Sequence, residues 1–205
     1  MGPQAAAVLV PVKAFGHAKQ RLAGVLDGPG RRALAAAMAE TVLRAAGDLR
    51  AAVVCDDDEV RTWAESLGAD AIWTPDLGLN GAVEAGIAHL ARRGVERVIV
   101  AHADLPLATD LTWLADTDGA TFVPDRHRDG TNVLCVPTGV GFAPAYGAGS
   151  FRAHRAEAAR LGLVTRLVPD VALGWDVDVA EDLAVPAELD PPAYLAGAVT
   201  VPVDR

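Results

Sequence analysis

The stretch VLVPVKAFGHAKQRL, residues 8–22, joins an apolar run to a basic loop, and the rest of the chain can be placed around it. The aliphatic residues up to Val12 predict a buried strand. The loop that follows carries three cations, Lys13, Lys19 and Arg21, in a chain of net charge −9. Open α/β sheets bind ligands at the carboxyl ends of parallel strands, so these cations indicate a place for an anion. A solvated basic loop explains the same residues equally well, and the remaining sequence has to decide.

The size and composition favour one globular domain. The chain has 205 residues and 51% hydrophobic content, enough to bury a substantial core. We expect a single domain over residues 1–205, with a loosely held tail from about residue 186. The net negative charge argues against nucleic-acid binding, which needs a basic face. Cys55 and Cys135 lie in apolar runs and predict buried thiols rather than a disulfide or a zinc site.

Neither a targeting segment nor a membrane span is expected. No apolar run reaches the roughly 18 residues that a membrane-spanning helix needs. The N-terminal segment lacks the basic start of a secretion signal, and its apolar run leads directly into the Lys13 loop. We therefore expect a cytoplasmic protein.

Strand-like and helix-like segments alternate along the chain. After the first strand, strands are expected at 51–55, 70–73, 97–101, 120–123, 132–136 and 163–168. Helices are expected at 30–49, 56–67, 79–94 and 150–161, with shorter ones near 110–115 and 180–184. The early alternation predicts an α/β fold with a mostly parallel sheet that helices cover on both faces.

Three aspartates are candidates for a metal site. Asp104 follows the apolar strand 97–101, at the sheet edge where the Lys13 loop should lie. Asp176 and Asp178 are two residues apart in an extended segment, so their side chains point the same way. Carboxylate oxygens are the ligands that Mg²⁺ prefers beside substrate phosphates. The alternative is that Asp176 and Asp178 only cap the short helix that follows.

Two small-residue segments could hold an anion. Residues 147–150, GAGS, precede a helix and offer backbone N–H groups and the Ser150 hydroxyl, although an ordinary helix cap has the same pattern. Thr131 lies in a similar turn, which could be no more than a turn. The five histidines show no metal-ligand spacing, and most are expected on the surface or on helices. No hydrolase motif appears, which leaves phosphoryl or nucleotidyl transfer, where a phosphate nucleophile needs no general base.

Six motifs in order carry a family resemblance. They are PVK…AKQRL at 11–22, LNGA at 79–82, ADLP at 103–106, PDR…GTN at 124–132, YG…SF…H at 146–154 and WDVD at 175–178. Together they resemble the guanylyltransferases of coenzyme F-420 biosynthesis, which act on 2-phospho-L-lactate or phosphoenolpyruvate. The first loop has one glycine instead of the usual glycine-rich form, which favours this subfamily over molybdenum-cofactor or sugar-nucleotide enzymes.

The resemblance implies a fold and a set of site residues. It implies a Rossmann-like, GT-A-like nucleotidyltransferase domain that binds GTP and Mg²⁺ at the C-terminal strand edge. By similarity, Asp104, Asp176 and Asp178 would bind the metal, and Lys13, Lys19 and Asp104 would form the catalytic set. Lys13, Arg21 and Asn80 would bind the nucleotide, Asn80 near the guanine. Thr131, Gly147 and Ser150 would bind the acceptor. Which cation meets which phosphate is left open.

The implied reaction joins GMP from GTP to the phosphate of phosphoenolpyruvate or 2-phospho-L-lactate and releases pyrophosphate. A downstream transferase would take the product. The Ala-, Arg- and Gly-rich composition slightly favours phosphoenolpyruvate. The alternatives are a related transferase that uses 3-phosphoglycerate or CTP, or a nucleotide-binding protein without activity on the same fold. A homodimer is compatible with the sequence.

Overall fold

The computed structural model describes residues 6–198 and contains a seven-stranded sheet of order β3-β2-β1-β4-β6-β5-β7. The strands are β1 (Ala6–Pro11), β2 (Arg50–Cys55), β3 (Asp70–Trp73), β4 (Arg97–Ala101), β5 (Ala120–Pro124), β6 (Thr131–Pro137) and β7 (Thr165–Leu167). All neighbouring pairs are parallel except the two that involve β6. The prediction of a mixed, mostly parallel sheet is therefore confirmed, with β6 as the reversed strand.

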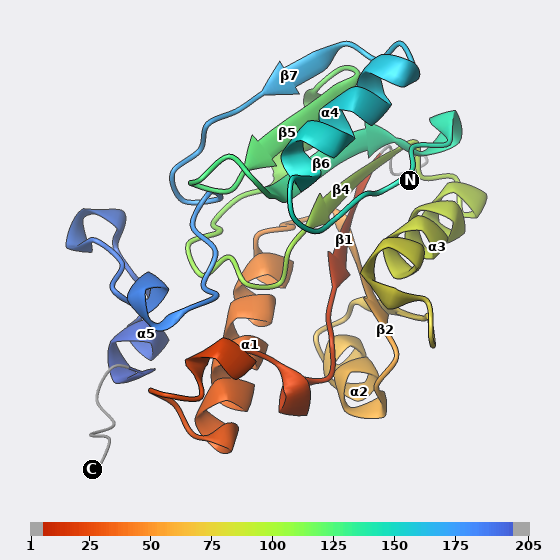
Figure 1. Ribbon diagram of the computed structural model, residues 1–205. Coiled ribbons are helices and arrows are strands. Elements are labelled where there is room, and N and C mark those ends of the chain that lie inside the picture. The colour runs from red at the N-terminus through yellow and green to blue at the C-terminus, as the bar shows by residue number, and fades with distance from the viewer. Residues whose placement is uncertain (1–5, 199–205) are drawn as a thin grey trace.

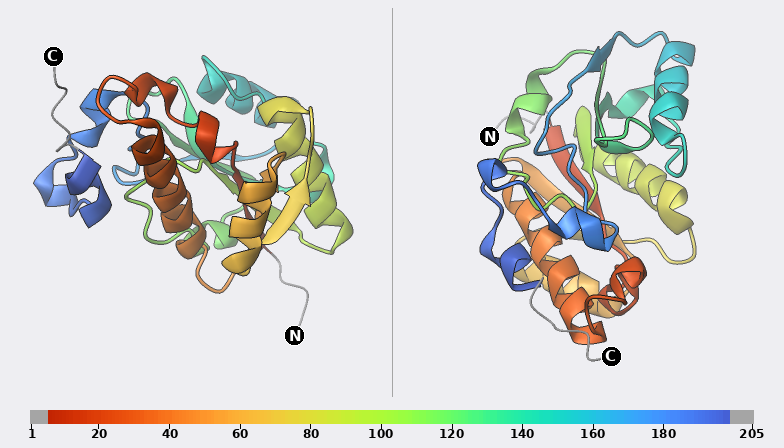
Figure 2. Two further views of the ribbon diagram at one scale, coloured as in Figure 1. Left: turned by 90° about the horizontal axis from the view of Figure 1, so that it is seen from below. Right: turned by 60° about the vertical axis from the view of Figure 1, so that its left-hand side comes forward.

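Helices cover both faces of the sheet. They are α1 (Gly28–Arg44), α2 (Asp58–Ser66), α3 (Gly78–Arg92), α4 (Ser150–Arg160) and the short α5 (Ala193–Ala198). The side chains of β1 alternate between two cores: Val8 and Val10 pack with α1 and α2, and Ala7 and Leu9 pack with α3 and α4. The right-hand view of Figure 2 shows α3 and α4 on one side of the sheet and α1 on the other. This burial on both faces explains the continuous apolar run of the first strand.

The structure differs from the predicted elements mainly at their ends and after β7. Helix α1 ends at Arg44, before the predicted end at Leu49, and the predicted helices near 110–115 and 180–184 are short 3₁₀ turns. In the predicted tail, Leu195 of α5 is 1% exposed and packs with Leu34 and Met38 of α1. Figure 1 shows α5 beside α1. The last part of the predicted tail, residues 199–205, lies outside the described residues.

Two further predictions concern the cysteines and the membrane-spanning helices. Cys55 and Cys135 are both buried free thiols, as predicted. Within residues 6–198, no helix is long and apolar enough to span a lipid bilayer.

Gly119 fixes the start of β5 against the segment before β7, and we expect Gly119→Ala to destabilise the fold strongly. Gly119 has φ +64°, and a Cβ there would lie 2.1 Å from the backbone oxygen of Val164. The left-handed conformation and the clash together should lower the free energy of unfolding by roughly 3 kcal/mol. Gly162→Ala is the matched control, because Gly162 has φ +68° and a Cβ there would meet nothing within 4 Å. Urea unfolding of both variants measures the difference, and equal losses would contradict the argument.

Candidate active site

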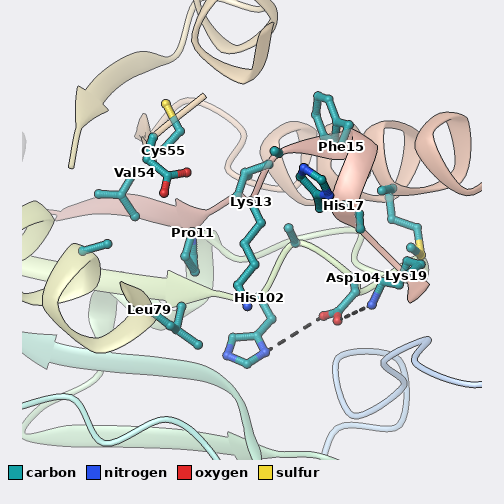
Figure 3. Close-up of a pocket in the computed structure, with 18 of the residues that line it drawn as sticks. Pro11, Lys13, Phe15, His17, Lys19, Val54, Cys55, Leu79, His102 and Asp104 are labelled. Atoms are coloured by element: carbon teal, nitrogen blue, oxygen red, sulfur yellow. Dashed lines mark hydrogen bonds and ion pairs between the residues drawn. The ribbon is translucent and has the colours of Figure 1, made fainter. Parts of the chain in front are cut away.

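A cavity of about 710 Å³ opens at the carboxyl ends of β1, β2 and β4. Its walls include Lys13, Lys19 and Arg21 from the loop after β1, Asp104 from the loop after β4, and Asp178 from the far end of the chain. The basic loop, Asp104 and Asp178 therefore meet at one edge of the sheet, as the sequence predicts. Figure 3 shows the labelled side chains around this cavity, with Lys13 extending from the end of β1 toward His102.

Lys19 joins two of the three predicted metal ligands. Its Nζ donates to Asp104 Oδ2 at 2.7 Å and to Asp178 Oδ1 at 3.1 Å. The Lys19 backbone is left-handed, with φ 51°, a conformation that costs a lysine about 1 kcal/mol. Its side chain is only 11% exposed. The loop thus adopts an unfavourable conformation that brings a buried cation to two carboxylates.

The charges of the neighbouring side chains shift the pKa values of Lys19 and Asp104. Burial alone would lower the pKa of Lys19, but the charges of Asp104 and Asp178 outweigh it and raise that pKa above its ordinary value. Burial would likewise raise the pKa of Asp104, yet the Lys19 charge, with a smaller effect of His102, holds it below its usual range. The ion pair is therefore charged at neutral pH. Asp104 Oδ1 is buried and has no hydrogen-bond partner in the described part of the chain.

Asp176 lies near the other two aspartates but has different partners. Asn132 donates to Asp176 Oδ1 at 3.3 Å, and the Arg126 guanidinium is 3.6 Å from the same oxygen. Burial, and then the negative charge of Asp104, raise the pKa of Asp176. Asp178 contributes a smaller effect in the same direction. The three carboxylates thus interact electrostatically, although Asp176 is not among the residues that line the cavity.

The alternative role of Asp176 and Asp178 as helix caps is not what the structure shows. The backbone N–H groups of Asp178 and Val179 donate to the Asp182 carboxylate, at 2.7 Å and 2.8 Å. Asp182 therefore makes the local turn, and it also pairs with Arg126. The carboxylate of Asp178 is directed to Lys19 instead.

The carboxylate oxygens of these aspartates are the type of ligand that Mg²⁺ prefers. Within residues 6–198, no three His, Cys, Asp or Glu side chains are arranged so that they could hold a metal ion. Mg²⁺ commonly uses only one or two carboxylates together with substrate phosphates. The unpartnered Oδ1 of Asp104, with Asp178 on the other side of Lys19, supplies hard oxygen donors of that type. Asp104, Asp176 and Asp178 are therefore not arranged as a three-ligand site in the described structure, and their joint binding of Mg²⁺ stays a prediction.

Two of the predicted nucleotide-binding residues, Arg21 and Asn80, have different surroundings. Arg21 lies at the cavity mouth, where its side chain is 75% exposed and its Nη1 is 3.9 Å from Asp178 Oδ2. Asn80 is bound to the main chain of Tyr146: its Oδ1 accepts from the Tyr146 N–H at 2.6 Å, and its Nδ2 donates to the Tyr146 carbonyl at 3.2 Å. Asn80 thus ties α3 to the loop before α4, and its contact with guanine stays a prediction.

The predicted acceptor residues form a second, buried group. Thr131 and Ser150 are 1% and 3% exposed, and the Thr131 N–H donates to Ser150 Oγ at 3.1 Å. Gly147 has φ 130°, in the region that favours glycine. The cap of α4 is Gly149, so Ser150 is not the ordinary cap that its sequence allows. None of these residues lines the cavity around Lys19.

Three aromatic residues connect the cavity group to the acceptor group, and no role was predicted for any of them, although Tyr146 and His154 belong to the motif at 146–154. The Tyr146 ring lies 4.9 Å from that of His102 and 4.7 Å from that of His154, measured between centroids. His102 lines the cavity, with Nδ1 4.0 Å from Asp104 Oδ1, whereas His154 is fully buried. The expectation that most histidines are surface or helix residues is confirmed, since His154 is on α4, but it gave no role to His102 or His154. The position of His102 directly after β4 was the available signal.

Solved structures with a similar fold include a nucleotidyl transferase and a nucleotide-diphospho-sugar transferase. The chain matches a protein from Desulfovibrio desulfuricans G20, described as a nucleotide-diphospho-sugar transferase, with TM-score 0.67 and 19% identity over 87% of this chain and 84% of that one. It matches a nucleotidyl transferase from Methanothermobacter with TM-score 0.61 and 15% identity, over 94% and 98% of the two chains. At these identities the likenesses show the fold: the chain has the fold of these transferases.

Proteins with a similar sequence identify the family of this chain within the fold class. A phosphoenolpyruvate guanylyltransferase from Conexibacter woesei is 39% identical, over 88% of this chain and 86% of its own length. Another from Sphaerobacter thermophilus is 35% identical, over 85% and 89%. Residues 6–186 match the family model described as "Guanylyl transferase CofC like". The chain belongs to this family.

Proposed function

We propose that the protein is a guanylyltransferase that joins GMP from GTP to the phosphate of phosphoenolpyruvate, releasing pyrophosphate. Membership of the family and the activity named for the relatives support the reaction and this acceptor. 2-Phospho-L-lactate has the same phosphate and carboxylate and is the second acceptor to test. The two buried free thiols are compatible with a reducing compartment, and we place the reaction in the cytoplasm.

The observation that carries the proposal is the Lys19–Asp104–Asp178 group at the wall of a cavity large enough for a nucleotide. In the reaction, an acceptor phosphate oxygen forms a bond to the α-phosphorus of GTP. The bond from that phosphorus to the bridging oxygen breaks, and pyrophosphate leaves with the electron pair. The nucleophile is already anionic, so no side chain has to remove a proton. The requirements are alignment and compensation of negative charge.

The residues of the chain supply both requirements. Lys13 and Arg21, at the exposed part of the cavity, are placed to neutralise the triphosphate, and Lys19 provides a third cation deeper inside. Asp104 and Asp178 would hold Mg²⁺, which when bound neutralises phosphate oxygens and orients the leaving group. Thr131, Gly147 and Ser150 would hold the acceptor on the side of β6 and α4.

We expect pyrophosphate release with GTP and phosphoenolpyruvate in the presence of MgCl₂. The decisive assay combines four nucleoside triphosphates with phosphoenolpyruvate, 2-phospho-L-lactate and 3-phosphoglycerate, and identifies the product by mass. The expected product is a guanosine diphosphate linked to the three-carbon acid, a substrate for a further transferase. Preference for CTP or 3-phosphoglycerate would replace the proposal with the related activity. GTP binding without pyrophosphate release in any combination would show a protein that binds the nucleotide but does not turn it over.

A further inference from the structure

The buried group around Thr131 contains a histidine whose two ring nitrogens both have partners. The Ala145 N–H donates to His154 Nε2 at 2.9 Å, and His154 Nδ1 lies 3.0 Å from Thr131 Oγ1. His154 is 0% exposed. Burial, with a smaller effect of the His102 charge, lowers the pKa of His154 to about 4, so the ring is neutral near pH 7.

These contacts assign the position of the ring proton. A backbone N–H can only donate, so Nε2 of the neutral ring has to accept from Ala145. The single ring proton is then on Nδ1, and His154 donates to the Thr131 hydroxyl. Thr131 Oγ1 therefore accepts a hydrogen bond from His154 Nδ1. The Thr131 N–H in turn donates to Ser150 Oγ.

The hydroxyl groups of Thr131 and Ser150 therefore each keep a proton that can be donated to a ligand. The hydrogen bonds described within residues 6–198 use the Thr131 and Ser150 oxygens as acceptors from His154 and from the Thr131 N–H. A hydroxyl that accepts in this way still has one proton to donate, and an anion is its strongest acceptor. A Cβ built at Gly147 or Gly149 would meet no atom within 4 Å, so the outer side of this turn is open.

We propose that His154 is a positioning residue that orients the Thr131 hydroxyl as a donor to the anionic acceptor. The inference rests on the proposed function, because it assumes that Thr131 contacts the phosphate or carboxylate of the phospho-acid. The ring cannot rotate away easily, since it packs against Tyr146 and against Phe142, with ring centroids 4.7 Å and 5.9 Å away. The donor is thus oriented before the acceptor arrives, which lowers the cost of ordering on binding.

Two matched variants separate this role from packing. His154→Asn keeps an N–H donor at the position of Nδ1 and loses the acceptor for Ala145. His154→Gln keeps an acceptor at the position of Nε2 and loses the donor to Thr131. Each variant loses one of the two hydrogen bonds, so similar decreases in melting temperature are expected, whereas only His154→Gln should disturb Thr131.

We expect His154→Gln to raise the KM for phosphoenolpyruvate about tenfold, the effect of losing one oriented hydrogen bond, with the KM for GTP unchanged. His154→Asn should keep the acceptor KM close to that of the wild type. Equal changes in both variants, or parallel changes in the two KM values, would show that His154 only supports packing and would overturn the proposal.

A second measurement does not depend on activity. Nitrogen-15 NMR of the imidazole should show the His154 proton on Nδ1, without titration between pH 6 and 8. A proton on Nε2 would overturn the assignment. If the wild-type protein releases no pyrophosphate from GTP and phosphoenolpyruvate, the proposed function fails, and the NMR result still decides the state of the histidine.

Discussion

Asp104→Asn is expected to reduce the rate of pyrophosphate release about a thousandfold at saturating GTP, acceptor and MgCl₂. Asp104 is a half-buried carboxylate of the cavity wall, and its Oδ1 has no partner in the described part of the chain, so this atom is available to a bound cation. Asparagine has nearly the same shape but removes the charge that would hold the cation. It also removes the closest counter-ion of Lys19, at 2.7 Å.

The measurement is a steady-state pyrophosphate assay, with melting temperatures to show that the variant is folded. Asp110→Asn is a suitable control, because Asp110 lies on the same loop and its carboxylate accepts only from the Thr112 N–H and hydroxyl in the described contacts. That variant should keep wild-type turnover. If Asp104→Asn retained more than about a tenth of the wild-type rate, the role of Asp104 in holding Mg²⁺ and in catalysis would be wrong.

Lys19→Met is expected to have two opposite effects: turnover falls about a hundredfold, and stabilisation of the free protein by Mg²⁺ increases. The Lys19 ammonium already lies between the carboxylates of Asp104 and Asp178, at 2.7 Å and 3.1 Å. A divalent cation therefore has to replace it there. In the variant the carboxylates have lost this competing charge and should bind Mg²⁺ more tightly, while the phosphates lose a cation.

Melting temperature as a function of MgCl₂ concentration, without nucleotide, measures the second effect. Arg21→Met serves as a comparison for the magnesium response, because Arg21 is 75% exposed and lies 3.9 Å from Asp178. Its response should stay close to that of the wild type, since exposed ion pairs contribute little. An unchanged magnesium response in Lys19→Met would show that the ammonium and the metal do not compete for the same oxygens.

The sequence was most informative where a strand runs directly into polar residues. The apolar runs that end before Lys13 and before Asp104 identified two neighbouring parallel strands, and parallel strands direct their carboxyl ends to one edge. The meeting of the basic loop and Asp104 was therefore predictable. The contact of Lys19 with Asp178 was not, because it joins residues 159 positions apart through irregular chain.

The roles that sequence reasoning missed belong to residues whose function depends on tertiary partners. A histidine in the middle of a helix has no local pattern that says whether it is exposed, and the burial of His154 follows from packing against Tyr146 and Phe142. For Asn80, whose nucleotide contact stays a prediction, the sequence did not indicate that its amide also holds the Tyr146 backbone. The packing of Leu195 on α1 was hidden because α5 is too short to show a helical period.

The reversed direction of β6 has a consequence for how this family could diversify. Because β6 runs against β4, its first residue, Thr131, lies at the same edge as the last residues of β1 and β4. In the proposed reaction, the nucleotide side would use residues of the first half of the chain together with Asp178, and the acceptor side one later segment, residues 131–154. If these roles hold, selection for a new phospho-acid would act mainly on that segment, while the residues that bind the triphosphate would stay unchanged.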